Sequence, residues 1–157
     1  MKALLLLGCP EVPSQTPMAI YAIDKLTDMG YDVTVSSNPA AAKLVKVSDP
    51  KKYYKHENVN IDNFLDQVEG SDFDLILGFV HKDSAATYFI TYCTLMTDVK
   101  AIALVFQRDS SLVEEYAQMV AQSTDAEIIK SKAYHNPNPI RVSLDKALNK
   151  LKEENNN

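Results

Sequence analysis

The chain has 157 residues, of which 46% are hydrophobic and 24% charged, and its formal net charge is −5. A chain of this length forms one globular domain and buries roughly 70% of its unfolded surface. The acidic balance and the lack of a basic stripe argue against nucleic acid as a partner. No apolar run approaches the ~18 residues of a membrane span, so we expect a soluble protein without a membrane partner.

The cysteines and histidines are few and scattered. Cys9 and Cys93 lack the spacing of a disulfide framework or a zinc site, which favours free thiols and a cytoplasmic location. His56, His81 and His135 lie on separate predicted loops, so no metal site is expected. The sequence does not identify a cofactor.

In the first forty residues the pattern predicts a β-loop-α-β unit. Lys2–Leu7 is a continuous apolar run that suits a central strand. Prolines keep the next stretch a loop, and the helix is expected to start with Thr16 as N-cap and Pro17 as its first residue. It ends at Gly30, and Asp32–Ser36 resumes an extended pattern.

Residues 39–70 are longer than a usual connection and should fold over the sheet or its edge. They carry two predicted short helices, Pro39–Val47 and Asn63–Val68, the second capped by Asp62 and ended by Gly70. Lysines alternate with aromatic residues in this tract (Lys51, Lys52, Tyr53, Tyr54, Lys55, His56). Such a pattern can grip a phosphate backbone, but in an acidic chain it favours a solvated connection with the tyrosines tucked against the domain.

After Gly70, strands and helices alternate regularly. The expected strands are Phe73–Val80, Lys100–Phe106 and Glu127–Lys130, and the expected helices are Ser84–Thr97 with Asp83 as N-cap, Ser110–Gln122 and Ile140–Lys152. This alternation predicts a three-layer α/β/α fold, Rossmann-like or flavodoxin-like, with a mostly parallel sheet of about five strands. The domain should span residues 1–152, followed by a frayed tail at 153–157.

The predicted helix 84–97 has almost no polar face. A helix that is apolar all round needs cover on more than its sheet-facing side. A second subunit could supply this cover, which predicts a homodimer through residues 84–97. The long tract 39–70 is the competing cover.

Ligands of open parallel sheets bind beyond the carboxyl ends of the strands. We therefore expect a pocket there for an anionic small molecule, with Lys82 and Arg108 meeting its charge and backbone amides near Thr16 assisting. The candidate ligand-binding residues are Gly8, Pro10, Thr16, Ser37, Asn38, Lys82, Arg108 and Ser110. Neither GxGxxG nor a P-loop is present.

A nucleophilic site is the alternative at the same edge. If strand 73–80 neighbours the first strand, Cys9 lies near His81, and a thiol beside an imidazole can act as a nucleophile with the imidazole as its base. The other interpretation of Cys9 is a small apolar residue at a strand end.

The segments GCPEVPSQTP, after the first strand, and GYDVTVSSNPAAAKL, around the second, resemble a small family of conserved α/β proteins from methanogenic archaea, known as a domain of unknown function. The resemblance implies a compact three-layer fold and a cytoplasmic archaeal protein, and it supplies no activity. Three hypotheses remain open: a binding module for a small molecule or a partner, a thiol-dependent enzyme or sulfur carrier using Cys9 with His81, and a structural subunit docking through helix 84–97.

Overall fold

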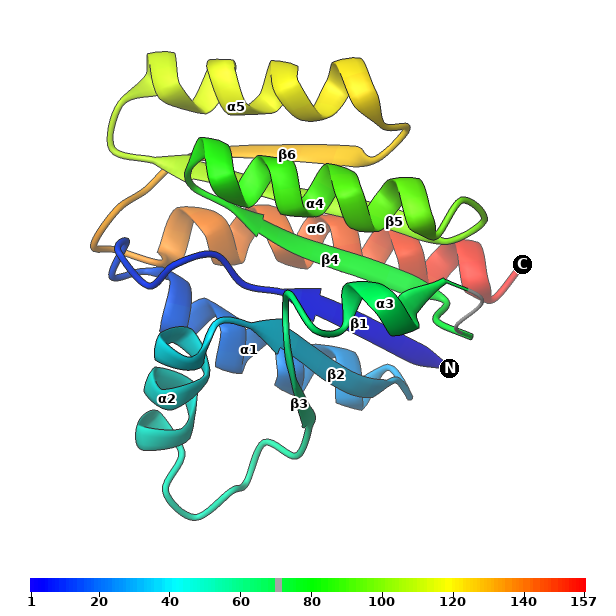
Figure 1. Cartoon of the computed structure of the whole chain (residues 1–157). Coiled ribbons are helices and arrows are strands. Elements are labelled where there is room, and N and C mark those ends of the chain that lie inside the picture. The colour runs from blue at the N-terminus through cyan, green and yellow to red at the C-terminus, as the bar shows by residue number, and fades with distance from the viewer. Residues whose placement is uncertain (70–71) are drawn as a thin grey trace.

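A single parallel sheet of six strands forms the centre of the molecule (Figure 1). The computed structural model describes residues 1–69 and 72–157. All the pairings are parallel, and the order is β3-β2-β1-β4-β5-β6. The strands are β1 (Lys2–Leu6), β2 (Asp32–Ser37), β3 (Glu57–Asn60), β4 (Leu75–Val80), β5 (Lys100–Gln107) and β6 (Glu127–Lys132).

Helices cover both faces of this sheet. Successive residues of each central strand point to opposite faces, and because the residues on both faces are apolar, each face needs a covering layer. Ala3 and Leu5 of β1 join one buried cluster, and Leu4 and Leu6 join the other. The first cluster contains α1 (Gln15–Asp28), α2 (Pro39–Ser48) and α6 (Asn138–Asn155), and the second contains α3 (Leu65–Val68), α4 (Asp83–Leu95) and α5 (Ser110–Ser123).

The prediction of a three-layer α/β/α fold is therefore confirmed, with an order that places β1 and β4 at the centre. Along the described residues, the structure contains no helix long and apolar enough to cross a membrane. Helix α6 continues to Asn155, past the predicted end at Lys152.

The predicted count of about five strands is wrong, because β3 adds a sixth. Its residues Glu57–Asn60 are mostly polar and exposed or half-buried. An edge strand pairs on one side only and needs little apolar surface, so the search for apolar runs passes over it.

Three predicted helix starts also differ from the structure. Helix α1 has Ser14 rather than Thr16 at its N-cap, and α4 has Lys82 rather than Asp83. Helix α3 begins at Leu65, so Asp62 is not its cap, and the expected stop at Gly70 lies outside the described residues. Polar side chains adjoin each of these starts, and local sequence does not decide which one occupies the cap.

Helix α4 is covered by other parts of the same chain. It packs against α5 and α3, and the Tyr92 hydroxyl lies 3.0 Å from Ser36 Oγ and donates to the Ile61 carbonyl at 2.8 Å. The long tract before β4 thus supplies the cover that the apolar helix needs. The homodimer through this helix stays a prediction.

The tyrosines of the tract do not tuck against the domain. Tyr53 is 73% exposed and Tyr54 37% exposed, which corrects the expectation for this connection. Both lie in the loop between α2 and β3.

Candidate functional site

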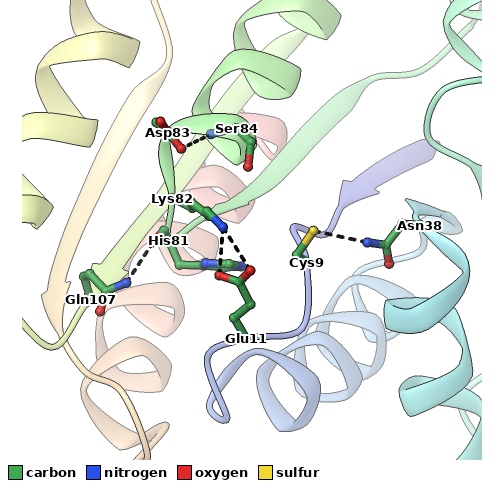
Figure 2. Close-up of polar contacts among 8 residues, drawn as sticks. All are labelled: Cys9, Glu11, Asn38, His81, Lys82, Asp83, Ser84 and Gln107. Atoms are coloured by element: carbon green, nitrogen blue, oxygen red, sulfur yellow. Dashed lines mark hydrogen bonds and ion pairs between the residues drawn. The ribbon is translucent and has the colours of Figure 1, made fainter.

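The carboxyl ends of the parallel strands form one edge of the sheet, which we call the carboxyl edge. Its centre is a topological switch point. From β1 the chain continues to β2 and β3 on one side, and from β4 to β5 and β6 on the other. The loops that leave β1 and β4 therefore diverge, which in open parallel sheets creates the crevice that binds ligands. Figure 2 shows polar side chains at this edge, among them Cys9 and Glu11 from the loop after β1 and His81 and Lys82 from the loop after β4.

The loop after β1 is held in place by the first residue of α1. The Gln15 side chain accepts from the Gly8 N–H at 3.0 Å and donates to the Gly8 carbonyl at 2.9 Å. Gly8 is required by a close approach, since a Cβ there would lie 2.7 Å from His81 Nε2. The loop after β1 and the end of β4 are thus in direct contact.

Cys9 is exposed and faces the end of β2. Its Sγ accepts from Asn38 Nδ2 at 3.3 Å (Figure 2). The Asn38 side chain is itself fixed, because its Oδ1 accepts from the Ala41 N–H at 2.8 Å and caps α2. Asn38 thus presents its amide donors toward the loop after β1.

Lys82 and Glu11 form an exposed ion pair across the two loops. Lys82 Nζ donates to the two Glu11 carboxylate oxygens at 2.9 and 3.2 Å (Figure 2). This hydrogen bond, and then the Glu11 charge, raise the pKa of Lys82, and the neighbouring Cys9 adds a smaller contribution. Because an exposed pair of this kind is weak, an incoming anion can replace Glu11 at the ammonium group.

His81 is buried beneath this pair. Its side chain is 1% exposed, and neither Nδ1 nor Nε2 has a hydrogen-bond partner. Burial lowers the pKa of His81, while the backbone of Cys9, the Glu11 charge and the backbone of His81 itself oppose this effect. The imidazole is therefore held neutral near pH 7, with one donor and one acceptor nitrogen to offer.

Two buried serines, like His81, have side-chain polar atoms without a hydrogen-bond partner. Among residues 1–69 and 72–157, the buried side-chain polar atoms without a partner are Ser14 Oγ, Ser37 Oγ and the two His81 nitrogens. Ser14 precedes α1 in the loop after β1, Ser37 ends β2, and His81 follows β4. All three lie at the carboxyl edge of adjacent strands, where buried polar groups without partners need an explanation.

The structure brings most of the predicted site residues together. Gly8, Cys9, Pro10, Ser37, Asn38, His81 and Lys82 all follow or end the neighbouring strands β1, β2 and β4, and Thr16 is the second residue of α1. Arg108 and Ser110 instead follow β5, where the Arg108 guanidinium lies over the Tyr134 ring at 4.1 Å. Cys9 and His81 lie at the same edge, but the sulfur bonds Asn38 and the imidazole bonds neither sulfur nor any other group of the described chain.

Sequence reasoning missed two residues of the site. Neither Ser14 nor Gln15 is among the candidate ligand-binding residues that the sequence predicts. Gln15 is nonetheless buried and holds the loop at Gly8, a role that depends on the turn 8–14 folding back on the helix. No signal in the sequence distinguishes it from any other polar residue at a helix start.

Wide hollows lie at the opposite, amino edge. One of about 620 Å³ is lined by Cys93, Lys100 and Asp125, among others, and one of about 730 Å³ by Lys2, Asp32 and Phe64. Both are large enough for a small molecule, but their linings contain none of the unpartnered buried atoms. We therefore place the candidate site at the carboxyl edge. Within the described residues, no group of three or more metal-ligating side chains comes together.

Comparison with known proteins gives a family and a fold. A family model described as "Domain of unknown function (DUF1890)" matches residues 4–147. The "Uncharacterized protein MJ0452" of Methanocaldococcus jannaschii is 34% identical over 155 residues, which cover 98% of this chain and 96% of that protein.

Solved structures agree with the architecture. The chain is similar to the protein in "Structure of MT0777", with 41% identity, a TM-score of 0.89, and coverage of 92% of this chain and 95% of that one. The cypemycin decarboxylase CypD is 13% identical with a TM-score of 0.58, over 99% of this chain and 96% of its own. The second likeness shows the fold alone.

Proposed function

The chain belongs to the DUF1890 family, and because that name states no activity, we propose from the site itself that the protein is a binding module for a small anionic molecule. The observation that carries this proposal is that three buried side chains without hydrogen-bond partners, Ser14, Ser37 and His81, lie at the carboxyl ends of the adjacent strands β1, β2 and β4. Leaving such groups unpaired costs roughly 1–3 kcal/mol each. A ligand that bonds to them offsets this cost.

The chemistry of the site favours an anion. Lys82 supplies a cation that an anion can take over from Glu11, and Asn38 supplies an amide donor beside Cys9. The hydroxyls of Ser14 and Ser37 donate to anionic oxygens, and the neutral His81 offers one donor and one acceptor. Arg108, one strand further along, is a second cation for an extended ligand.

A thiol-dependent enzyme or sulfur carrier is the second candidate. Its support is that Cys9 is exposed at the same edge as His81. It is the weaker proposal, because a base must reach its nucleophile through a hydrogen bond, and Cys9 Sγ accepts from Asn38 instead. The two free thiols fit a reducing compartment, and we propose the cytoplasm as the place of action.

The test is the melting temperature of the protein with inorganic phosphate, citrate, and nucleoside mono- and diphosphates. A binder of the folded state raises the melting temperature in proportion to the logarithm of its concentration. We expect at least one of these anions to raise it, and Lys82→Ala and Ser37→Ala to reduce the rise. Lys130→Ala is the matched control, since Lys130 forms a similarly exposed pair with Glu114 at 2.9 Å, away from the site.

The same assay separates the two candidates. A binding module keeps its ligand-induced rise in melting temperature in Cys9→Ser, whereas a site that depends on the thiol loses that rise. The proposal fails if none of these anions changes the melting temperature, or if Lys82→Ala and Lys130→Ala respond alike.

A further inference from the structure

A second surface lies on α2 and the loop that joins it to β3, away from the candidate site. Of the six large apolar side chains that the described part of the chain leaves strongly exposed, four lie here: Leu44, Val47, Tyr53 and Tyr54. Val47 is 65% exposed and Tyr53 73%. We call these residues and the lysines among them, Lys43, Lys46, Lys51, Lys52 and Lys55, the lysine–tyrosine surface.

The charge of this surface opposes that of the whole chain. Residues 39–56 contain five lysines and one acidic residue, Asp49, while the full chain carries −5. All five lysines are exposed, and among the ion pairs of the described residues none involves them. The surface is therefore a local cationic field with unpaired ammonium groups around apolar side chains.

The loop that displays the tyrosines is built around the buried Asp49. Its carboxylate accepts from the backbone N–H groups of Tyr53 at 3.0 Å and Tyr54 at 2.9 Å. The Asp49 carbonyl accepts from the Lys52 N–H at 3.0 Å, and Lys52 takes a left-handed backbone with φ of 54°. A non-glycine residue rarely adopts this conformation without compensation, so the exposure of the tyrosines is a fixed feature of the fold.

Two adjoining hollows form a groove from α2 to the edge strand. One, of about 340 Å³, is lined by Val45, Tyr54 and His56 among others, and one, of about 620 Å³, by Ala42 and Val47 among others. They share Lys46, Asp49, Lys52 and Asn58. The groove thus combines an apolar floor with lysines on its rim and reaches β3 at Asn58.

Strand β3 is the outermost strand on this side of the sheet, beside the loop (Figure 1). It pairs with β2 alone among the strands of the described chain, so its outer side faces no other strand; only the Asn60 carbonyl, at the end of the strand, already accepts from the Phe64 N–H at 3.0 Å. A free edge of this kind is a template for an added strand. In β-augmentation the main chain of a peptide bonds to such an edge while alternate side chains enter a neighbouring groove.

We propose that the lysine–tyrosine surface binds an extended, acidic segment of another protein, which adds to the edge of β3. The segment places apolar side chains in the groove and carboxylates against the lysines. A single-stranded nucleic acid would also meet lysines and exposed tyrosines, but it has no use for an apolar groove or for a free strand edge. The peptide accounts for all these features of the surface.

The test uses a fluorescent peptide of alternating glutamate and leucine residues, followed by fluorescence anisotropy and by amide NMR of the labelled protein. We expect binding that weakens with salt and shifts the amides of Asn58 and Val59. The double variant Lys46→Glu/Lys52→Glu should weaken binding by about tenfold or more, because it replaces two attractions with repulsions. Lys146→Glu on α6, an exposed lysine away from the surface, is the matched control.

Defined results overturn the proposal. The proposal is wrong if the glutamate–leucine peptide does not bind, or if a lysine–leucine peptide binds equally well. It is also wrong if the double variant and Lys146→Glu lose the same amount of peptide affinity. Tighter binding of oligouridine would assign the surface to nucleic acid, and self-association that Val47→Glu abolishes would assign it to a second copy of this chain. Lys82→Ala should leave peptide binding unchanged, so this inference and the anion site fail independently.

Discussion

His81 joins two properties that a side chain seldom has together, full burial and two unpartnered ring nitrogens. It packs near the Phe106 ring, with centroids 5.7 Å apart, and under the Gly8 backbone. An apolar residue would fill such a place at lower cost, since an unpaired buried polar group destabilises the fold. A buried, unpartnered histidine with a lowered pKa at the carboxyl ends of the strands is a functional candidate on physical grounds.

The burial of His81 predicts a pH dependence of stability. Its pKa is lowered in the folded state from the ordinary 6.5, so below that pH the unfolded chain binds a proton that the folded chain does not. The free energy of unfolding should therefore fall as the pH drops from 6.5 toward the lowered pKa. His81→Leu should remove this contribution, as chemical denaturation at a series of pH values above the carboxylate range will measure.

His135→Leu is the control, because His135 is exposed at the same edge of the sheet. It should keep the wild-type dependence on pH. Identical pH profiles of the wild type and His81→Leu would show that the buried imidazole does not resist protonation.

At the scale of single residues, the sequence predicts which side chains lie at the site better than it predicts the contacts that they make. Cys9, Asn38 and Lys82 could be predicted because strand ends follow from apolar runs and the carboxyl edge from parallel topology. The bond from Asn38 to Cys9 depends on where α2 starts, and the unpartnered state of Ser14 and Ser37 depends on packing around them. Local sequence contains neither.

Among the elements, α4 and β4 are in close contact at Gly78. A Cβ on Gly78 would lie 2.7 Å from Phe89 Cε2 and nearer still to Cδ2. Phe89 is buried, and its ring lies against the strand at Gly78. The glycine in this otherwise apolar strand is thus explained by the close approach of a helix side chain.

Gly78→Ala should destabilise the protein by about 1–3 kcal/mol, the usual cost of overpacking a core. Urea unfolding followed by circular dichroism measures this change. Phe89→Leu in the same chain makes room for the new methyl group, so the double variant should lose less than the sum of the two single losses. Strictly additive losses would mean that the contact between β4 and α4 does not set the requirement for glycine.

The elements divide into those that apolar patterns reveal and those that they do not. The buried strands β1, β4 and β5 could be predicted because each is a continuous apolar run covered on both faces. Strand β3 could not, because it is polar and takes its register from β2. The cover of α4 by the tract before β4 was one of two alternatives, and the bonds of Tyr92 support it.

For the whole molecule, the alternation of strands and helices was enough to predict the architecture, and the strand order was not. The order β3-β2-β1-β4-β5-β6 depends on whether each crossover connection places the next strand on one side of the sheet or on the other. No residue pattern encodes that choice by itself. Once β1 and β4 are known to be neighbours, the position of the switch point between them follows. The two proposed surfaces lie apart on the molecule, the anion site at the switch point and the peptide surface at the β3 edge.

The most direct measurement of the central claim is a titration of the labelled protein with inorganic phosphate and citrate, followed by amide NMR. We predict that the largest shifts fall on Gly8, Cys9, Asn38 and Lys82, around the switch point between β1 and β4. Shifts that gather instead around Lys100 and Asp125, at the hollow on the amino edge, would contradict it. So would a spectrum that neither anion changes.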